Sequence, residues 1–138
     1  MNLKINRLQH IGLPVTDLTR SEKFYEKLGF RQVMASDFEF KGEKGQVAMM
    51  QQGDMIIEIY QMPAAELQEI SRRRDGHVDH IACDVDDIEV AFAELQQASF
   101  QILEPAPVFL PFWEKGCRYF NIVGPDGEKL EFNQIITS

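Results

Sequence analysis

Hydrophobic and polar residues alternate along two stretches of this chain, which is the pattern of half-buried β-strands. In residues 8–15 and 78–85 a histidine, His10 or His80, falls on the face opposite to a row of apolar residues. These rows are Ile11, Leu13 and Val15 in the first stretch and Ile81, Cys83 and Val85 in the second. Both stretches are therefore predicted to be strands, each with one apolar face.

Each of these strands is followed by the pattern of an amphipathic helix. Asp17 and Asp86 are of the residue type that caps helix N-termini, and Gly29 is placed to end the first helix. In the second helix the apolar residues recur every three or four positions, at Ile88, Ala91, Phe92, Leu95 and Ala98. We therefore expect helices close to residues 18–28 and 88–98.

Short strand-like runs follow each helix. They lie at residues 30–34, 46–51 and 55–60, and again at 100–104, 117–123 and 129–134. Gly53-Asp54 and Pro125-Asp126-Gly127 are typical of the tight turns in hairpins. The order βαβββ thus occurs twice and predicts an α+β fold, with helices on one face of a mixed, mostly antiparallel sheet.

The two halves of the chain are also similar in sequence. The segment RLQHIGLPVTDL aligns with HVDHIACDVDDI, which pairs His10 with His80. The segment GDMIIEIYQ aligns with DGEKLEFNQ, which pairs Glu58 with Glu131. A period of about 70 residues is longer than that of solenoid repeats, so it indicates a duplicated module that packs as a pair. We expect a single domain, 1–138, with modules at about 6–61 and 77–135 and a linker at about 62–76.

The alternation places four metal-ligand side chains on the face that the helices leave free. His10 and His80 lie opposite the apolar rows of their strands, and Glu58 and Glu131 alternate in the same way with the apolar residues beside them. An unpaired carboxylate in an apolar strand is costly to bury, and a divalent cation removes that cost. Two imidazoles and two carboxylates suit zinc, nickel, cobalt, manganese or ferrous iron. The sequence predicts one divalent metal ion on these four residues.

Composition and charge narrow the classes of function. The chain has 14 basic and 22 acidic residues, a net charge of −8, and nucleic acid is not an expected partner because phosphate binding needs clustered positive charge. No apolar run approaches the roughly 20 residues of a membrane helix, and the start lacks the apolar core of a signal peptide, so we expect a cytoplasmic protein without membrane contact. Cys83 and Cys117 are too few for a disulfide framework.

The segments LQHIGLPVTDLTRSEKFYEKLGF, VDHIACDVDD and GPDGEKLEF together carry a family resemblance. Over essentially its whole length the chain resembles the vicinal oxygen chelate superfamily, also called the glyoxalase/bleomycin-resistance fold. The resemblance implies βαβββ modules paired into a cupped sheet around a metal, and a small-molecule substrate. The order of ligands is similar to that of glyoxalase I, which implies that His10, Glu58, His80 and Glu131 bind the metal and that Glu131 is also the base.

The segment VFLPFWEKGCRYF, residues 108–120, is not matched to glyoxalase I. It contains Trp113, which is the only tryptophan, beside Phe112, and it leads into a strand with Arg118. Two interpretations stay open: a loop that packs its aromatic residues on its own module, and a lid in which Phe112, Trp113 and Arg118 bind substrate. No glutathione-binding set is matched either, so the use of a thiol cofactor stays open.

The expected chemistry is proton transfer next to a carbonyl group. A metal stabilises the enediolate that forms when the proton leaves, one carboxylate holds the metal, and the other acts as base, so Glu58 and Glu131 are the expected catalytic residues. The expected function is a metal-dependent isomerase or lyase of the glyoxalase I type, acting on a small α-hydroxycarbonyl or hemithioacetal compound.

Other functions of the superfamily give two alternatives. Acyl-CoA and sugar-type epimerases share this plan, although acyl-CoA epimerases tend to have glutamine where Glu58 stands; a metal-free drug-binding protein would not need the ligand set. Extradiol dioxygenases and fosfomycin-type thiol transferases use three protein ligands, so Glu58 argues against both. A homodimer is expected, with the site either within one chain or across the dimer.

Overall fold

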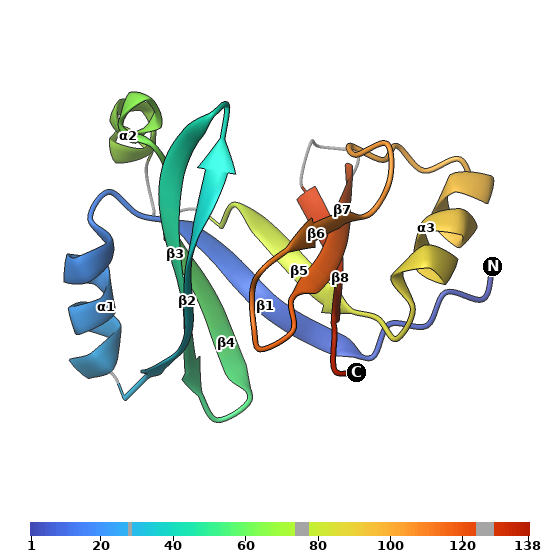
Figure 1. Cartoon of the computed structure of the whole chain (residues 1–138), viewed down its shortest axis with the longest axis horizontal. Coiled ribbons are helices and arrows are strands. Elements are labelled where there is room, and N and C mark those ends of the chain that lie inside the picture. Colours follow the sequence, from blue (N-terminus) through green and yellow to red (C-terminus); the bar gives the residue numbers. More distant parts are fainter. Residues whose placement is uncertain (28, 74–77, 124–128) are drawn as a thin grey trace. The chain divides into compact units, whose positions relative to one another are not determined.

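The helices and strands follow the duplicated βαβββ plan (Figure 1), and the α+β fold class is confirmed. The computed structural model describes residues 1–27, 29–73, 78–123 and 129–138. In chain order the elements are β1 (Arg7–Pro14), α1 (Leu18–Lys27), β2 (Arg31–Phe40), β3 (Glu43–Gln52), β4 (Met55–Gln61), α2 (Ala64–Ser71), β5 (His80–Asp84), α3 (Ile88–Gln97), β6 (Val108–Leu110), β7 (Cys117–Val123) and β8 (Lys129–Ile135).

The chain divides into two compact units. We call His10–Asp79 the first unit, and Met1–Gln9 together with His80–Ser138 the second unit. In the first unit the strand order is β2-β3-β4-β1, in which β1 and β4 are parallel and the other pairs antiparallel. In the second unit the order is β5-β8-β7-β6, in which β5 and β8 are parallel and the other pairs antiparallel. Each unit thus repeats the same pairing.

The first helix begins and ends where the sequence predicts. The backbone N–H of Arg20 donates to Asp17 Oδ1 at 3.1 Å, so Asp17 caps the helix N-terminus. Gly29 lies just beyond its C-terminus with φ +98°, a backbone conformation that glycine adopts without strain. α1 packs against β3 and β4. The resulting core contains Leu18, Ala48, Met50, Ile57 and Ile59.

In the second unit, α3 packs against β7 and β8, and the three lie together at the right of Figure 1. The buried core there contains Val85, Ile88, Ala91, Leu95, Phe120, Ile122 and Phe132. The rings of Phe120 and Phe132 stack at a centroid distance of 5.3 Å, and Phe92 of α3 contacts Phe120 edge-on at 5.1 Å. The helix is therefore fixed to the sheet by aromatic contacts as well as by aliphatic ones.

These two cores confirm the predicted alternation of side chains. Ile57 and Ile59 belong to the core beneath α1, so Glu58 between them points to the opposite face of the first sheet. Phe132 belongs to the core beneath α3, with Leu130 packed against it, so Glu131 points to the opposite face of the second sheet. Glu58 thus leaves its sheet on the side opposite to α1, and Glu131 leaves its sheet on the side opposite to α3.

The predicted strand at 100–104 is wrong. That segment forms only an isolated bridge between Ile102 and Ile122, and the strand beside β7 is β6. Two prolines, Pro105 and Pro107, separate the segments and lack the N–H that a continuous ladder needs. A side chain substitutes there, because Glu104 Oε1 accepts the backbone N–H of Asn121 at 2.6 Å.

Two helix features also differ from prediction. The predicted linker at 62–76 contains α2, an eight-residue helix that is too short to show a clear apolar period. The cap of α3 is Asp87 and not Asp86: Asp87 Oδ1 accepts the backbone N–H groups of Glu89 and Val90, each at 3.1 Å. Asp86 instead accepts Asn6 Nδ2 at 2.8 Å. The predicted turn at Pro125-Asp126-Gly127 lies outside the described residues.

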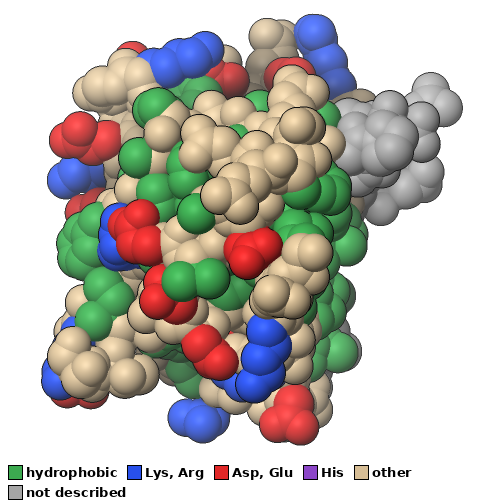
Figure 2. Space-filling model, turned by 90° about the vertical axis from the view of Figure 1, so that its right-hand side faces the viewer, with side chains coloured by type: hydrophobic (Ala, Val, Ile, Leu, Met, Phe, Trp, Pro, Cys, Tyr) green, Lys and Arg blue, Asp and Glu red, His purple; other side chains and the backbone are tan. Residues whose placement is uncertain are grey.

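The surface carries mixed side chains. On the face drawn in Figure 2, lysine and arginine are interspersed with acidic and hydrophobic groups. Among the described helices, none combines the length and the apolar character that crossing a membrane requires.

The two neighbouring aspartates before α3 make a matched test of the cap. Asp87→Ala is expected to lower the free energy of unfolding by about 1 kcal/mol, because two backbone N–H groups lose their acceptor. Asp86→Ala removes an equal charge without touching the helix N–H groups and should lower it less. Urea unfolding followed by circular dichroism measures both; equal losses would contradict the assignment of the cap.

Candidate functional site

Buried polar side chains mark the candidate site. In the described part of the chain, the polar or charged residues that are buried are Gln9, His10, Glu131 and Asn133, with 3%, 1%, 8% and 3% of their surface exposed. Burial of such groups is costly unless they are hydrogen-bonded, paired or bound to a metal. All four lie on β1 or β8, and two of them are predicted metal ligands.

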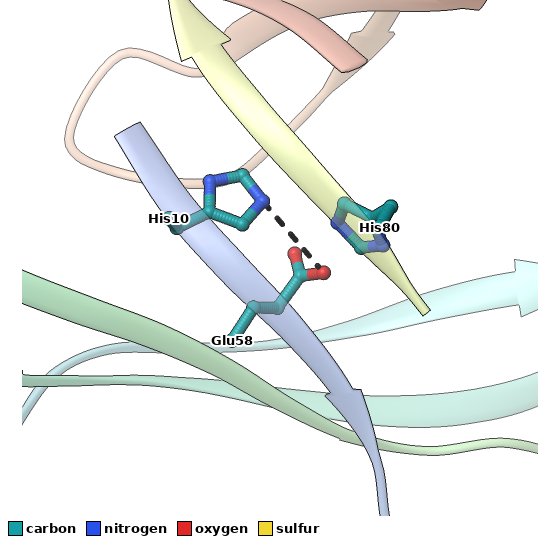
Figure 3. Close-up of side chains that lie close together, drawn as sticks. All are labelled: His10, Glu58 and His80. Carbon is teal, nitrogen blue, oxygen red and sulfur yellow. Dashed lines mark ion pairs between the residues drawn. The ribbon is translucent and has the colours of Figure 1, made fainter. Parts of the chain in front are cut away.

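The first unit contributes His10 and Glu58. Glu58 lies on β4, which runs parallel to β1 with Gly12 paired to Glu58. His10 Nε2 lies 3.9 Å from Glu58 Oε1, and Figure 3 marks this pair with a dashed line. The separation is longer than a hydrogen bond, so the two ligand atoms face each other without being in direct contact.

The second unit contributes the equivalent pair, His80 and Glu131. His80 lies on β5, which runs parallel to β8 with Ala82 paired to Glu131. His80 Nε2 lies 3.3 Å from Glu131 Oε1. The other carboxylate oxygen, Glu131 Oε2, accepts a hydrogen bond from Asn133 Nδ2 at 2.8 Å. The duplication therefore yields a histidine and a glutamate on adjacent parallel strands in each unit.

This donor set fits a divalent metal ion. His10, Glu58 and His80, the side chains drawn in Figure 3, offer imidazole nitrogens and a carboxylate oxygen, which are ligands for zinc and for the neighbouring transition metals. Glu131 is not one of these three; it is a carboxylate of the second unit in a buried position. Its burial beside a histidine is what a ligand role would require, since a metal neutralises the charge that burial otherwise penalises.

A match to a protein-family model shows the family to which the chain belongs. The model of the Glyoxalase/Bleomycin resistance protein/Dioxygenase superfamily matches residues 7–132. The chain belongs to this superfamily. The predicted family is thereby confirmed, and the match includes both units and all four candidate ligands.

The chain is also similar to individual known proteins. The chain is 30% identical to the Bacillus subtilis (strain 168) protein YwbC over 130 residues, 93% of this chain and 97% of that protein. Among solved structures, it is similar to hypothetical protein BH1468 from Bacillus halodurans C-125, with a TM-score of 0.76, 23% identity and 98% of each chain covered. It is also similar to methylmalonyl-CoA epimerase from Mycobacterium tuberculosis, with a TM-score of 0.79, 16% identity, and 99% and 93% covered. At these identities the two structures support the shared fold.

Of the predicted substrate residues, Arg118 lies on β7. Arg118 forms an ion pair with Glu89 of α3, and it shares its face of β7 with Phe120 of the helix-side core. Arg118 therefore points to the side of the sheet opposite to Glu131. The role of Arg118 in substrate binding stays a prediction, and this geometry does not favour it.

Phe112 and Trp113 lie in the connection between β6 and β7. Phe112 is buried. Trp113 has φ +68°, which is uncommon for a residue other than glycine, and its indole nitrogen is buried without a hydrogen-bond partner among the described residues. The burial of Phe112 and of the Trp113 indole nitrogen agrees with the interpretation as a packed loop, and the role as a lid stays a prediction.

Sequence reasoning missed Gln9 and Asn133. Asn133 has the same strand parity as Glu131, so the alternation that identified Glu131 also places this amide on the face without a helix. Gln9 has the strand parity of the apolar row that begins at Ile11, so alternation does not identify it, and its partners Asp84 and Asn133 are distant in sequence. Neither residue is a usual metal ligand, so a search for ligands alone does not find them.

Tyr60 lies on the same face of β4 as Glu58. Burial is the main factor that raises the pKa of the Tyr60 phenol far above its usual range, and the Asp79 carboxylate, which accepts its hydrogen bond, raises it further. The guanidinium of Arg73 lies 3.9 Å from Asp79 and 2.9 Å from Glu69. Tyr60 is therefore a neutral hydrogen-bond donor at any physiological pH.

This raised pKa predicts a dependence of stability on pH. The unfolded chain releases the Tyr60 proton near pH 10 and the folded chain retains it, so the free energy of unfolding should fall as the pH rises above about 10, by up to about 1.4 kcal/mol per pH unit. Below that pH the group contributes no slope. In Tyr60→Phe this part of the decline should disappear. Urea unfolding at pH 8, 10 and 11 measures it, and identical slopes in both proteins would contradict the assignment.

Proposed function

We propose that the protein is a metal-dependent isomerase or lyase of the glyoxalase I type. One divalent ion is held by His10, Glu58, His80 and Glu131, and the substrate is a small α-hydroxycarbonyl compound or a hemithioacetal. The observation that carries the proposal is the pair of equivalent histidine–glutamate sets, one in each unit, with each glutamate on the sheet face opposite to the helix-packed core.

The chemistry needs a base and a positive charge. When bound, a divalent metal ion supplies charge that stabilises the enediolate formed as a proton leaves the carbon next to a carbonyl. Glu131 acts as the base: its carboxylate takes that proton and returns it to the neighbouring carbon. Its position favours this role, because Asn133 and His80 hold the carboxylate in a buried place where water competes less for it. Glu58 serves as a ligand and orients the substrate.

An epimerase is the second candidate. The chain shares its fold with methylmalonyl-CoA epimerase from Mycobacterium tuberculosis, and proton removal next to a carbonyl is common to both reactions. Glu58 favours the glyoxalase-type reaction, since a second carboxylate completes the four-ligand set. A screen of hydroxycarbonyl compounds, with and without thiols, and of acyl-CoA esters separates the two candidates.

We also propose a cytoplasmic homodimer. This rests on the sequence and on the family, and light scattering across a concentration series tests the assembly. A monomer at every concentration would contradict it.

Metal binding is tested by substitution of one ligand from each unit. Glu58→Ala and His80→Ala should each weaken metal binding by more than about 100-fold, since the loss of a ligand should exceed the effect of the residues around it. Glu94→Ala, on α3, removes a carboxylate that accepts the backbone N–H of Asn2; it is the matched control and should bind metal as the wild type does. Isothermal titration with zinc, nickel and cobalt measures the affinities. Unchanged affinity in both ligand variants would contradict the ligand assignment, and a wild type that binds none of these metals would favour a metal-free binding protein.

The role of Glu131 as base predicts a separation of binding from turnover. Glu131→Gln keeps an oxygen that can reach the metal but cannot accept a proton at neutral pH, so metal affinity should fall moderately and turnover by about 10²- to 10⁴-fold. In Glu58→Gln a larger share of the defect should lie in metal retention. Exchange of the carbon-bound hydrogen of the substrate in deuterated solvent reports proton removal directly. A metal-loaded Glu131→Gln variant that exchanges at the wild-type rate would exclude Glu131 as the base.

A further inference from the structure

We propose that Asn133 is a positioning residue for Glu131, and that Gln9 and Asp84 fix the direction of its amide. The four residues form one hydrogen-bonded chain inside the second unit. The consequence for metal binding rests on the function proposed above, while the positioning itself concerns the protein's own side chains and can be measured without metal.

The first link joins Asn133 to Glu131. Asn133 Nδ2 donates to Glu131 Oε2 at 2.8 Å, and Glu131 Oε1 lies 3.3 Å from His80 Nε2. The two oxygens of the carboxylate therefore have different partners: one faces the amide of the neighbouring position on its own strand, and the other faces a candidate ligand. Turning the carboxylate out of its present plane would break the contact with Asn133.

The next link joins Asn133 to Gln9. Gln9 Nε2 donates to Asn133 Oδ1 at 3.1 Å and also lies 3.1 Å from the backbone oxygen of Asn133. The same nitrogen lies 3.2 Å from Asp84 Oδ1. Gln9 and Asn133 each expose only 3% of their surface, so water does not readily replace these partners.

The chain of bonds has one direction. A carboxylate and a backbone carbonyl only accept hydrogen bonds, so the amide nitrogen of Gln9 must face Asp84 and the backbone of Asn133. That nitrogen then faces Asn133 Oδ1, which directs Asn133 Nδ2 toward Glu131 and, at 3.8 Å, toward Cys117 Sγ. A reversed Asn133 amide would place oxygen against a carboxylate and nitrogen against nitrogen. Gln9 therefore acts on Glu131 without touching it.

This arrangement restricts how Glu131 can bind a metal. Oε2 is held by Asn133, so Oε1 is the oxygen offered on the side of His80. A glutamate side chain has three rotatable bonds, and fixing them before binding removes an entropy cost that the metal would otherwise have to offset. Partners that orient ligands in this way typically change metal affinity by about 10- to 100-fold.

The chain offers a matched control in Asn121. On β7, Asn121 is paired with Glu131 in the antiparallel register, but its Nδ2 donates to Glu104 Oε2 at 2.9 Å. Asn121 and Asn133 are thus two amides of the same unit, and each donates to a glutamate. Asn121→Leu breaks such a bond elsewhere, whereas Asn133→Leu breaks the bond to Glu131.

The first experiment is titration of each purified full-length protein with zinc and with cobalt. Asn133→Leu should bind about 10- to 100-fold more weakly than the wild type, with Gln9→Leu affected less and Asn121→Leu close to the wild type. The visible spectrum of bound cobalt should also change in Asn133→Leu, because the carboxylate is no longer held. If Asn133→Leu does not fold, Asn133→Ala and Gln9→Leu replace it in the same series.

The second experiment uses metal-free protein. The side-chain amide signal of Asn133 in ¹⁵N-resolved NMR spectra should exchange slowly with solvent, and it should shift in Glu131→Leu and Gln9→Leu but not in Asn121→Leu. If the wild type binds no metal but these shifts occur in the variants, the positioning by Asn133 would be upheld and the proposed function overturned. The opposite outcome has three parts: the wild type binds metal, Asn133→Leu binds it with the same affinity, and the Asn133 amide signal does not shift in Glu131→Leu. Together these results would overturn the positioning by Asn133 and leave the proposed function standing.

Discussion

In each unit a helix covers one face of the sheet, and because side chains alternate along a strand, every second residue is held away from that helix. Ile57 and Ile59 must stay in the core beneath α1, and Phe132 must stay in the core beneath α3. A shift of register by one residue would expose these side chains and bury Glu58 or Glu131 under a helix. The hydrophobic packing on one face therefore fixes the chemistry on the other.

The same constraint makes the buried polar residues informative. A buried carboxylate needs partners, and Glu131 has His80 on one oxygen and Asn133 on the other. The partners of Asn133 extend through Gln9 to the carboxylate of Asp84. Such a network stabilises the fold only when every polar group in it has a hydrogen-bond partner. Because this network includes Glu131, the stability of the second unit is linked to the geometry of a candidate metal ligand.

Membership of the glyoxalase superfamily defines the fold but does not define which reaction the protein catalyses. A superfamily of this kind supports several chemistries on one scaffold, so the argument for a reaction must come from particular residues. Here the second carboxylate, Glu58, favours a four-ligand metal site, and the buried Glu131 favours proton transfer. Arg118, paired with Glu89 of α3, shows the converse: a charged residue near the site in sequence can be directed to the helix side of its sheet.

The sequence by itself determined the duplication, the strand parity and hence the four candidate ligands, because the period of a β-strand is strict and both halves carry the same pattern. The tertiary structure decided what local pattern cannot show. The segment 100–104, expected to be a strand, forms a single bridge to β7. Its pairing depends on β7, which the local pattern of the segment before Pro105 does not show. Asp87 rather than Asp86 caps α3, since the path of the preceding strand sets which carboxylate reaches the helix N–H groups. The contact of Gln9 with Asn133 joins residues from opposite ends of the chain, and such a long-range hydrogen bond cannot be predicted from local pattern.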